Sequence, residues 1–255
     1  MMMINSKDSN ISLPLAQFAS ISFCVAVLRA ALEFKDITDA LAFYGVYHRE
    51  PLNQLIHFFG VPLFIWSVFI ILAHVPLFPM VQISLPGAPQ HCVTFATITA
   101  MGYIIFYLKI DPKCGGILYA PFVYLKYVIA VHLVEADRCQ QKMIHSKKSD
   151  NKTVINESFS YTGQVFKKAL ILNILVLYIQ IHPGHKIIEG AAPAIMKSFG
   201  GAFTSAPLFA FYEGLWYLGI NLPLKEQTKL LVDQYTEHLC TNTAVIMRAC
   251  ADCQS

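Results

Sequence analysis

The sequence predicts an all-α, multi-span helical membrane protein with about four to five membrane-embedded segments and an amphipathic helix near the N-terminus. Of the 255 residues, 55% are hydrophobic and only 14% are charged, whereas soluble domains carry about 25% charged residues. Several apolar runs approach the ~20 residues that a helix needs to cross a bilayer. Polar residues, among them His, Asn, Gln and Glu, gather where two of these runs begin or end.

Net charge and cysteine content exclude several classes of protein. The formal net charge is +3, and the basic residues form no stripe of the kind that binds nucleic acid. The seven cysteines are scattered, so neither a disulfide framework nor a zinc knuckle is expected. We therefore expect membrane lipid, and no nucleic acid, among the partners; the oligomeric state is not predicted.

The N-terminal part of the chain contains two different segments. Residues 1–31 are too polar at their start for a signal peptide and are expected to be a variable extension, either interfacial or a weak extra span. Residues 33–50 are expected to form the amphipathic helix, because Ile37, Leu41 and Tyr44 recur near one face. Pro51 then breaks this helix.

Apolar runs alternate with polar stretches along the rest of the chain. The stretch 76–91, with four prolines and one glycine, is expected to be a loop, and the lysine-rich stretch 135–167 the most flexible loop. The tail 221–255 is more polar and suggests an amphipathic helix. The runs expected to enter the membrane are 54–75, 92–110, 117–134, 169–182 and 202–220.

The polar clusters point to a metal site. Ionisable groups within membrane segments are costly, tend to face the bundle interior and are usually functional. His185 and Glu189 are four residues apart and share a helix face, while a break at Pro51 could aim His48 and His57 at one point. Imidazoles and a carboxylate from two segments suit a divalent ion such as iron, zinc or manganese.

Other polar residues have supporting or structural interpretations. Asn53, Gln180 and Tyr44 could fix the orientation of the imidazoles. A single histidine at a membrane interface is more often an anchor or a structural residue, and we interpret His74, His91 and His145 in that way. His132 and Glu213 stay open between a structural and a functional role.

Two signatures of spaced polar residues and glycines stand out in the sequence. The first is Tyr44-x3-His48-x4-Asn53-x3-His57-x2-Gly60-x-Pro62. The second is Gln180, Gly184-His185, Glu189 and Pro193-Ala194, and a looser third is Ala206-Pro207-Leu208-Phe209 followed by Glu213. These signatures resemble those of the Mpo1-like (DUF962) family of 2-hydroxy fatty acid dioxygenases. The resemblance covers about residues 32–220, which we take as the membrane domain.

The second signature departs from the family pattern in its spacing. Three residues separate Gln180 from Gly184-His185, whereas the family pattern has two. The additional length includes His182, which is either an extra ligand or a variation within the family.

The resemblance implies a multi-pass protein of the endoplasmic reticulum that uses Fe(II) and O2. Such proteins shorten 2-hydroxy long-chain fatty acids by one carbon, an α-oxidation in the degradation of phytosphingosine, a sphingolipid component. It implies His48, His57 and His185, and then His182, as iron ligands. Glu189 would be a fourth ligand, a base or an orienter of His185. Asn53 and Gln180 would orient ligands or bind the substrate carboxylate, and Arg49 would pair with that carboxylate or with a lipid headgroup.

The distribution of basic residues conflicts with a shared site for the two clusters. Basic residues before 54–75 and in 135–167 should both be cytosolic under the positive-inside rule, which would keep 117–134 from spanning. His185 would then be carried away from His48. We expect one shared site nonetheless, because two polar clusters cost less if they satisfy each other. Either the basic loop breaks the rule or one segment is re-entrant.

Three other classes of function remain open on the residues alone. A zinc-dependent lipid hydrolase would also use three histidines with an open position, and O2 consumption would separate it from an oxygenase. An ion- or proton-coupled transporter would use intramembrane His and Glu, but the sequence has no internal repeat. A structural membrane protein would tolerate loss of His48, His57 and His185.

Overall fold

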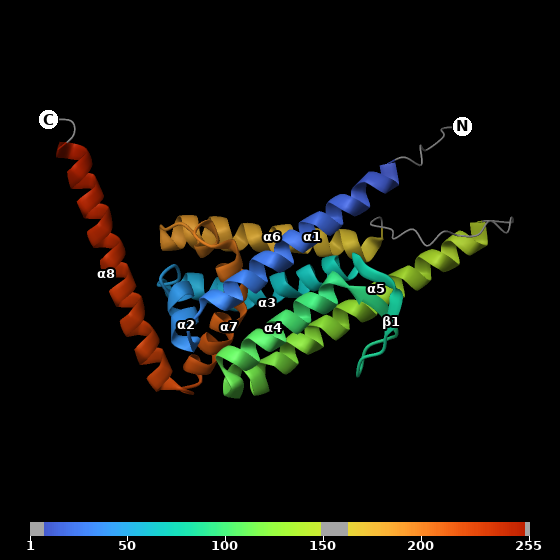
Figure 1. Ribbon diagram of the computed structural model, residues 1–255, viewed down its shortest axis with the longest axis horizontal. Coiled ribbons are helices and arrows are strands. Elements are labelled where there is room, and N and C mark those ends of the chain that lie inside the picture. The colour runs from blue at the N-terminus through green and yellow to red at the C-terminus, as the bar shows by residue number, and fades with distance from the viewer. Residues whose placement is uncertain (1–7, 149–162, 253–255) are drawn as a thin grey trace.

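The computed structural model describes residues 8–148 and 163–252, which form a bundle of long helices with one short hairpin (Figure 1). The all-α membrane fold is thereby confirmed. The α-helices are α1 (Asp8–Glu33), α2 (Ile37–Gly45), α3 (Pro51–Ala73), α4 (Phe95–Ile110), α5 (Ala120–Lys148), α6 (Gln164–Ile179), α7 (Phe199–Tyr217) and α8 (Leu222–Asp252). The shorter elements are π-helices η1 (Pro112–Tyr119) and η2 (Gln180–Glu189), 3-10 helix η3 (Ala194–Met196), and strands β1 (Pro76–Ile83) and β2 (His91–Thr94).

Within residues 8–148 and 163–252, three helical stretches are long and apolar enough to cross a membrane. They are Pro51–Ala73, Pro112–Met143 and Gln164–Glu189, and shorter apolar helices cover Gln17–Arg29 and Phe95–Ile110. α3 packs against α4, α5, α6 and α7 and forms the centre of the bundle. Only 17% of the apolar window of Gln164–Glu189 is buried, so α6 and η2 lie at the periphery with most of their surface available to lipid.

The predicted apolar run 202–220 corresponds largely to α7, whose composition reflects burial within the protein. Nearly every residue from Gly200 to Ala210 is buried, because α7 packs against α1, α2 and α3. The N-terminal segment predicted as an extension forms α1. Its Phe23 packs against Phe203 of α7 with ring centroids 5.2 Å apart, while Phe18 is 69% exposed on the outer face.

The predicted loop at 76–91 contains most of a β-hairpin. β1 and β2 pair antiparallel, with register shifts between Pro76 and Phe78 and between Phe78 and Gln82. Pro79 lies within the second shift and has no N–H to donate to a ladder, which explains why the strand pairing is irregular there. The prolines therefore disrupted the alternating pattern by which the strands could have been predicted.

The prediction of a loop over 135–167 is wrong for its first part, because α5 continues to Lys148. Arg138 donates through Nη2 to the main-chain oxygen of Ala73 at 3.0 Å and so covers the C-terminal end of α3. Its Nη1 pairs with Glu135 at 2.5 Å, one turn earlier. These contacts hold polar residues in a helix, and the remainder of this predicted loop falls mainly on 149–162, outside the described residues.

The chain path brings the two polar clusters to one end of the bundle. α3, α4 and α5 run back and forth along the bundle, and α6 returns η2 to the corner between α2 and α3 (Figure 1). The described end of α5 and the hairpin lie at the opposite end. Because α3, α4 and α5 each run along the bundle once, α6 starts at the opposite end and carries His185 back to His48.

Candidate metal centre

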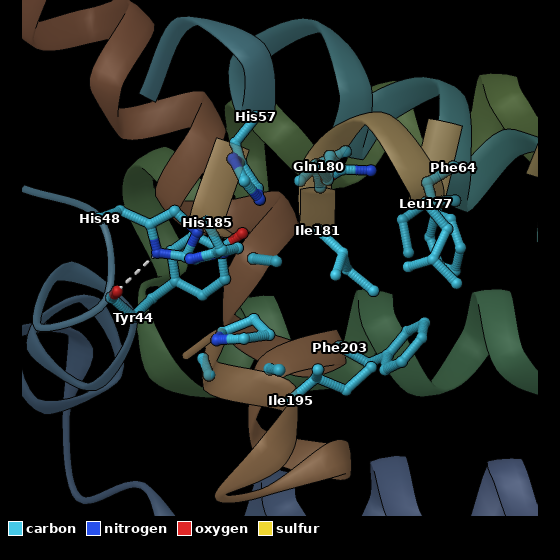
Figure 2. A pocket seen from close by; sticks show the side chains of 16 residues that line it. Tyr44, His48, His57, Phe64, Leu177, Gln180, Ile181, His185, Ile195 and Phe203 are labelled. Carbon is cyan, nitrogen blue, oxygen red and sulfur yellow. Dashed lines mark hydrogen bonds between the residues drawn. The ribbon is translucent and has the colours of Figure 1, made fainter. Parts of the chain in front are cut away.

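Three histidines converge between the α2–α3 corner and η2. His48, His57 and His185 are 2–4% exposed, and one ligand atom from each lies within 4.8 Å of the others. The ring centroids are 4.3 Å apart for His48 and His57, 4.6 Å for His48 and His185, and 5.0 Å for His57 and His185. Figure 2 shows the three rings facing one another at one end of a cavity. We call this group the histidine triad.

The corner between α2 and α3 places His48 in the triad. α2 starts at an Asp36 N-cap, which accepts from the Asp39 amide, and α3 begins with Pro51 at its first position. In the link between them, the His48 ring lies on Tyr44 with centroids 3.8 Å apart and an interplanar angle of 7°. The predicted helix–break–helix is therefore present and brings His48 next to His57 on α3.

Main-chain carbonyls set the orientation of two of the rings. The Nδ1 of His48 lies 2.8 Å from the Tyr44 oxygen, and that of His57 lies 2.9 Å from the Asn53 oxygen. A carbonyl oxygen only accepts, so each Nδ1 carries the proton and each Nε2 keeps its lone pair. This is the arrangement that metal-binding histidines commonly show.

The triad fits a divalent transition metal ion. The Nε2 of His48 and the Nδ1 of His185 are buried and have no hydrogen-bond partner among the described residues, which is costly unless a ligand or ion satisfies them. Burial lowers the pKa of His48 well below its ordinary value, and the charges of His57 and His185 lower it further. The ring is therefore neutral near pH 7 and able to donate its lone pair. Three imidazoles suit iron, zinc, copper or nickel.

Close approach of η2 to α3 depends on two glycines in the family signatures. A Cβ at Gly184 would lie 2.5 Å from the Asn53 Oδ1, and a Cβ at Gly60 would lie 2.9 Å from the Gln180 Cδ. Both distances are shorter than packed carbon atoms tolerate. Glycine at these two positions allows η2 to lie against α3 and hence brings His185 to the triad.

Glu189 forms hydrogen bonds to the α2–α3 corner and is not a member of the histidine triad. Its carboxylate accepts from the amides of Arg49 at 2.8 Å and Glu50 at 3.2 Å, and from the Asn53 side chain at 2.9 Å. These bonds join the end of η2 to the start of α3. None of these three bonds reaches His185, so the ligand, base and orienting roles that the sequence left open for Glu189 stay predictions.

The remaining predicted site residues lie around the triad. Gln180 is buried, donates to the Val176 oxygen at 3.1 Å and lines the cavity. His182 stacks on Tyr178 with centroids 5.4 Å apart and is not among the described residues that form the triad. Arg49 forms an ion pair with Asp233 of α8 at 2.9 Å.

An apolar cavity opens from the triad between α3, the α6–η2 helix and α7 (Figure 2). Its volume is about 70 Å³, which is roughly the space of two water molecules. A long acyl chain would therefore occupy only its start here and continue along the lipid-facing side. The apolar residues that line it include Val61, Phe64, Ile65, Leu177, Ile181 and Phe203.

The histidines interpreted as structural have local partners. The His74 Nδ1 lies 2.8 Å from the Ile70 oxygen, and the His91 Nε2 lies 2.6 Å from the Tyr127 hydroxyl. His132, which the sequence left open between a structural and a functional role, contacts the Gly87 oxygen through Nε2 at 2.8 Å. The side chain of His145 lies outside the described part of the chain.

A second, polar cavity beside His48 was missed at the sequence level. It is lined by Glu213 from α7 and by Lys225, Thr228 and Lys229 from α8. The α8 residues lie in the tail, beyond the resemblance to the family. Their spacing of three and four residues was the available signal, since it places them on one helix face.

The comparisons with known proteins give one match. The family model described as "2-hydroxy-palmitic acid dioxygenase Mpo1-like" matches residues 34–215. This stretch contains all three members of the histidine triad and lies within the predicted membrane domain 32–220. No curated protein and no solved structure matches the chain.

Proposed function

The chain belongs to the Mpo1-like family, and on that premise we propose that it is an Fe(II)-dependent dioxygenase for 2-hydroxy long-chain fatty acids. The proposed reaction converts the 2-hydroxy acid and O2 into a fatty acid one carbon shorter, CO2 and water. The bond between C1 and C2 breaks, C2 becomes the new carboxyl carbon, and O2 accepts the four electrons. In keeping with the family, we place the protein in the endoplasmic reticulum membrane and the reaction in phytosphingosine degradation.

The histidine triad at the end of an apolar cavity carries this proposal. His48 and His57 each keep an Nε2 lone pair, and the buried Nδ1 of His185 has no hydrogen-bond partner within the described residues. His48, His57 and His185 would hold the iron. Bound Fe(II) supplies a centre that can bind O2 and chelate a 2-hydroxy carboxylate. With three protein ligands, positions for both reactants remain open.

Residues around the triad have distinct proposed roles. Glu189 and Asn53 orient the corner that carries His48 and His57, through the hydrogen bonds between them. Gln180 lies on the wall of the apolar cavity, where its amide can orient the ligands of the triad. The apolar walls receive the first part of the acyl chain and keep water from the reacting carbons.

The test is product formation from 2-hydroxypalmitate. Protein purified in detergent, loaded with Fe(II) and supplied with air, should produce pentadecanoate detectable by mass spectrometry. The His185→Ala protein should produce none, whereas the matched control His182→Ala should retain activity. Absence of pentadecanoate from folded, iron-loaded wild type would contradict the proposal and favour a zinc hydrolase or a transporter.

A further inference from the structure

The polar cavity lies between the α2–α3 corner, the C-terminal half of α7 and the start of α8. Its volume is about 470 Å³, and His48 lines it as well as the apolar cavity. The triad is thus reached from two sides that differ in charge. Most of the surface of both cavities is apolar, but of the two only the second has charged side chains in its lining, among them Lys225, Lys229 and Asp233.

Buried polar groups without partners line the polar cavity. Glu213 is 4% exposed, and neither of its carboxyl oxygens has a hydrogen-bond partner among the residues that the structure describes. In the same part of the chain, the buried Trp216 Nε1 and Thr228 Oγ1 have no partner either. Such groups are expensive to leave unsatisfied, so this cavity is built to contain a polar ligand or ordered water.

The charges on its walls favour an anion. Arg49 and Asp233 neutralise each other in an ion pair. Lys225 and Lys229 also line the cavity, and within the described residues neither has a carboxylate within ion-pair distance. Burial raises the pKa of Glu213 to about 8, although the charge of Lys225 lowers it. Near neutral pH Glu213 is therefore mainly a carboxylic acid, which donates a hydrogen bond to an anion.

A fatty acid has the same division into two parts. Its chain suits the apolar cavity, and its carboxylate suits the lysines of the polar cavity. Because His48 lines both cavities, a fatty acid that occupies both must pass His48 with its first carbons. Reversal would put a charge among Val61, Phe64 and Leu177, which is strongly unfavourable. The two cavities therefore determine the direction in which an amphipathic anion lies.

We propose that the polar cavity is the head-group site of the substrate, with Lys225 as the ion-pair partner of its carboxylate and Glu213 as a hydrogen-bond partner. C1 then faces the polar cavity and C2 faces the triad. This inference rests on the proposed function for the identity of the acid. Lys225 and Glu213 are binding and positioning residues in this assignment, and Lys225 comes from the tail outside the family match.

Binding can be measured without turnover. In the Trp66→Phe background Trp216 is the sole tryptophan, and its fluorescence reports on the polar cavity. Metal-free protein in lipid nanodiscs would be titrated with 2-hydroxypalmitate and with its uncharged methyl ester. We expect a saturable change with the acid and at least tenfold weaker binding of the ester.

Variants assign the contacts. Lys225→Gln should weaken binding of the acid about fivefold, as expected for an exposed ion pair, whereas the matched exposed lysine variant Lys167→Gln should bind as wild type does. Glu213→Leu should weaken binding more than tenfold, and Glu213→Gln, which can still donate a hydrogen bond, should bind within about threefold of wild type. In turnover, Lys225→Gln should raise KM and leave kcat nearly unchanged.

Two results would overturn the head-group site. One is equal binding of acid and ester; the other is indistinguishable behaviour of Lys225→Gln and Lys167→Gln. Failure of the proposed function looks different. Charge-selective binding that depends on Lys225, without pentadecanoate production, would support the head-group site and contradict the dioxygenase proposal. Pentadecanoate production that Lys225→Gln leaves unaffected would support the dioxygenase proposal and contradict the head-group site.

Discussion

The rings of His48 and His57 are oriented by the carbonyls of Tyr44 and Asn53, residues that precede them by one helical turn. This local geometry needs no distant partner, so the sequence spacing alone could indicate it. His185 differs, because its position depends on the approach of η2 to α3. A residue-scale test should therefore separate the three triad members from His182, which the sequence left open.

The first prediction concerns how tightly variants of the triad and of His182 bind metal. His48→Ala, His57→Ala and His185→Ala should each lower metal affinity by more than about tenfold, because loss of outer-shell partners alone costs 10- to 100-fold. His182→Ala should retain wild-type metal content, because its ring stacks on Tyr178. Elemental analysis after dialysis against a weak chelator measures this. Equal losses for His182→Ala and His185→Ala would contradict the assignment.

Glu213 gives a prediction for the pH dependence of stability. Its carboxyl group titrates near 4.5 in an unfolded chain and near 8 when folded, so the folded state binds more protons between these values. The free energy of unfolding should therefore fall as pH rises through this window. Thermal unfolding between about pH 5 and pH 8 should show a larger loss for wild type than for Glu213→Gln. Parallel curves would show that Glu213 does not hold its proton.

At the scale of elements, the helix–break–helix and the two signatures could be predicted, but the neighbours of α3 could not. Pro51 and the spacing of His48 and His57 specify the corner locally. The continuation of α5 depends on Arg138 reaching Ala73, which lies 65 residues earlier. The contribution of Lys225 and Thr228 depends on how α8 docks. Such long-range contacts leave little trace in local periodicity.

Gly184→Ala tests the contact between η2 and α3. The added methyl group would lie 2.5 Å from the Asn53 Oδ1, so η2 must move away and carry His185 with it. Metal affinity should fall about 10- to 100-fold while the helical circular dichroism is retained. Gly102→Ala is the control, because a Cβ there meets its nearest atom at 3.8 Å. Unchanged metal affinity in Gly184→Ala would contradict the need for close approach.

At the scale of the whole molecule, the two ends of the bundle should face opposite sides of the membrane. Gln164–Glu189 is long enough to span, and it connects the end near the hairpin to the triad. Single-cysteine variants Lys167→Cys and Lys186→Cys, in sealed microsomes, should react with an impermeant maleimide from opposite sides. Labelling of both from one side would instead show a re-entrant segment.

Two cavities of the bundle meet at His48, one on each side of the proposed centre. The apolar cavity lies beside the peripheral α6–η2 helix, whereas the polar cavity lies beneath α8, and His48 belongs to both. The sequence indicated the ends of the apolar runs as the site. It did not indicate the two cavities, because each is lined by α7 together with segments that are distant from it in the sequence.

The most direct test of the dioxygenase proposal is the source of oxygen in the product. Fe(II)-loaded protein would be supplied with 2-hydroxypalmitate under ¹⁸O2, and the pentadecanoate analysed by mass spectrometry. The account predicts one ¹⁸O atom in the new carboxyl group, the other oxygen being that of the original hydroxyl, and no product from His185→Ala. Pentadecanoate without ¹⁸O, or equal product from His185→Ala, would contradict a dioxygenase centred on the histidine triad.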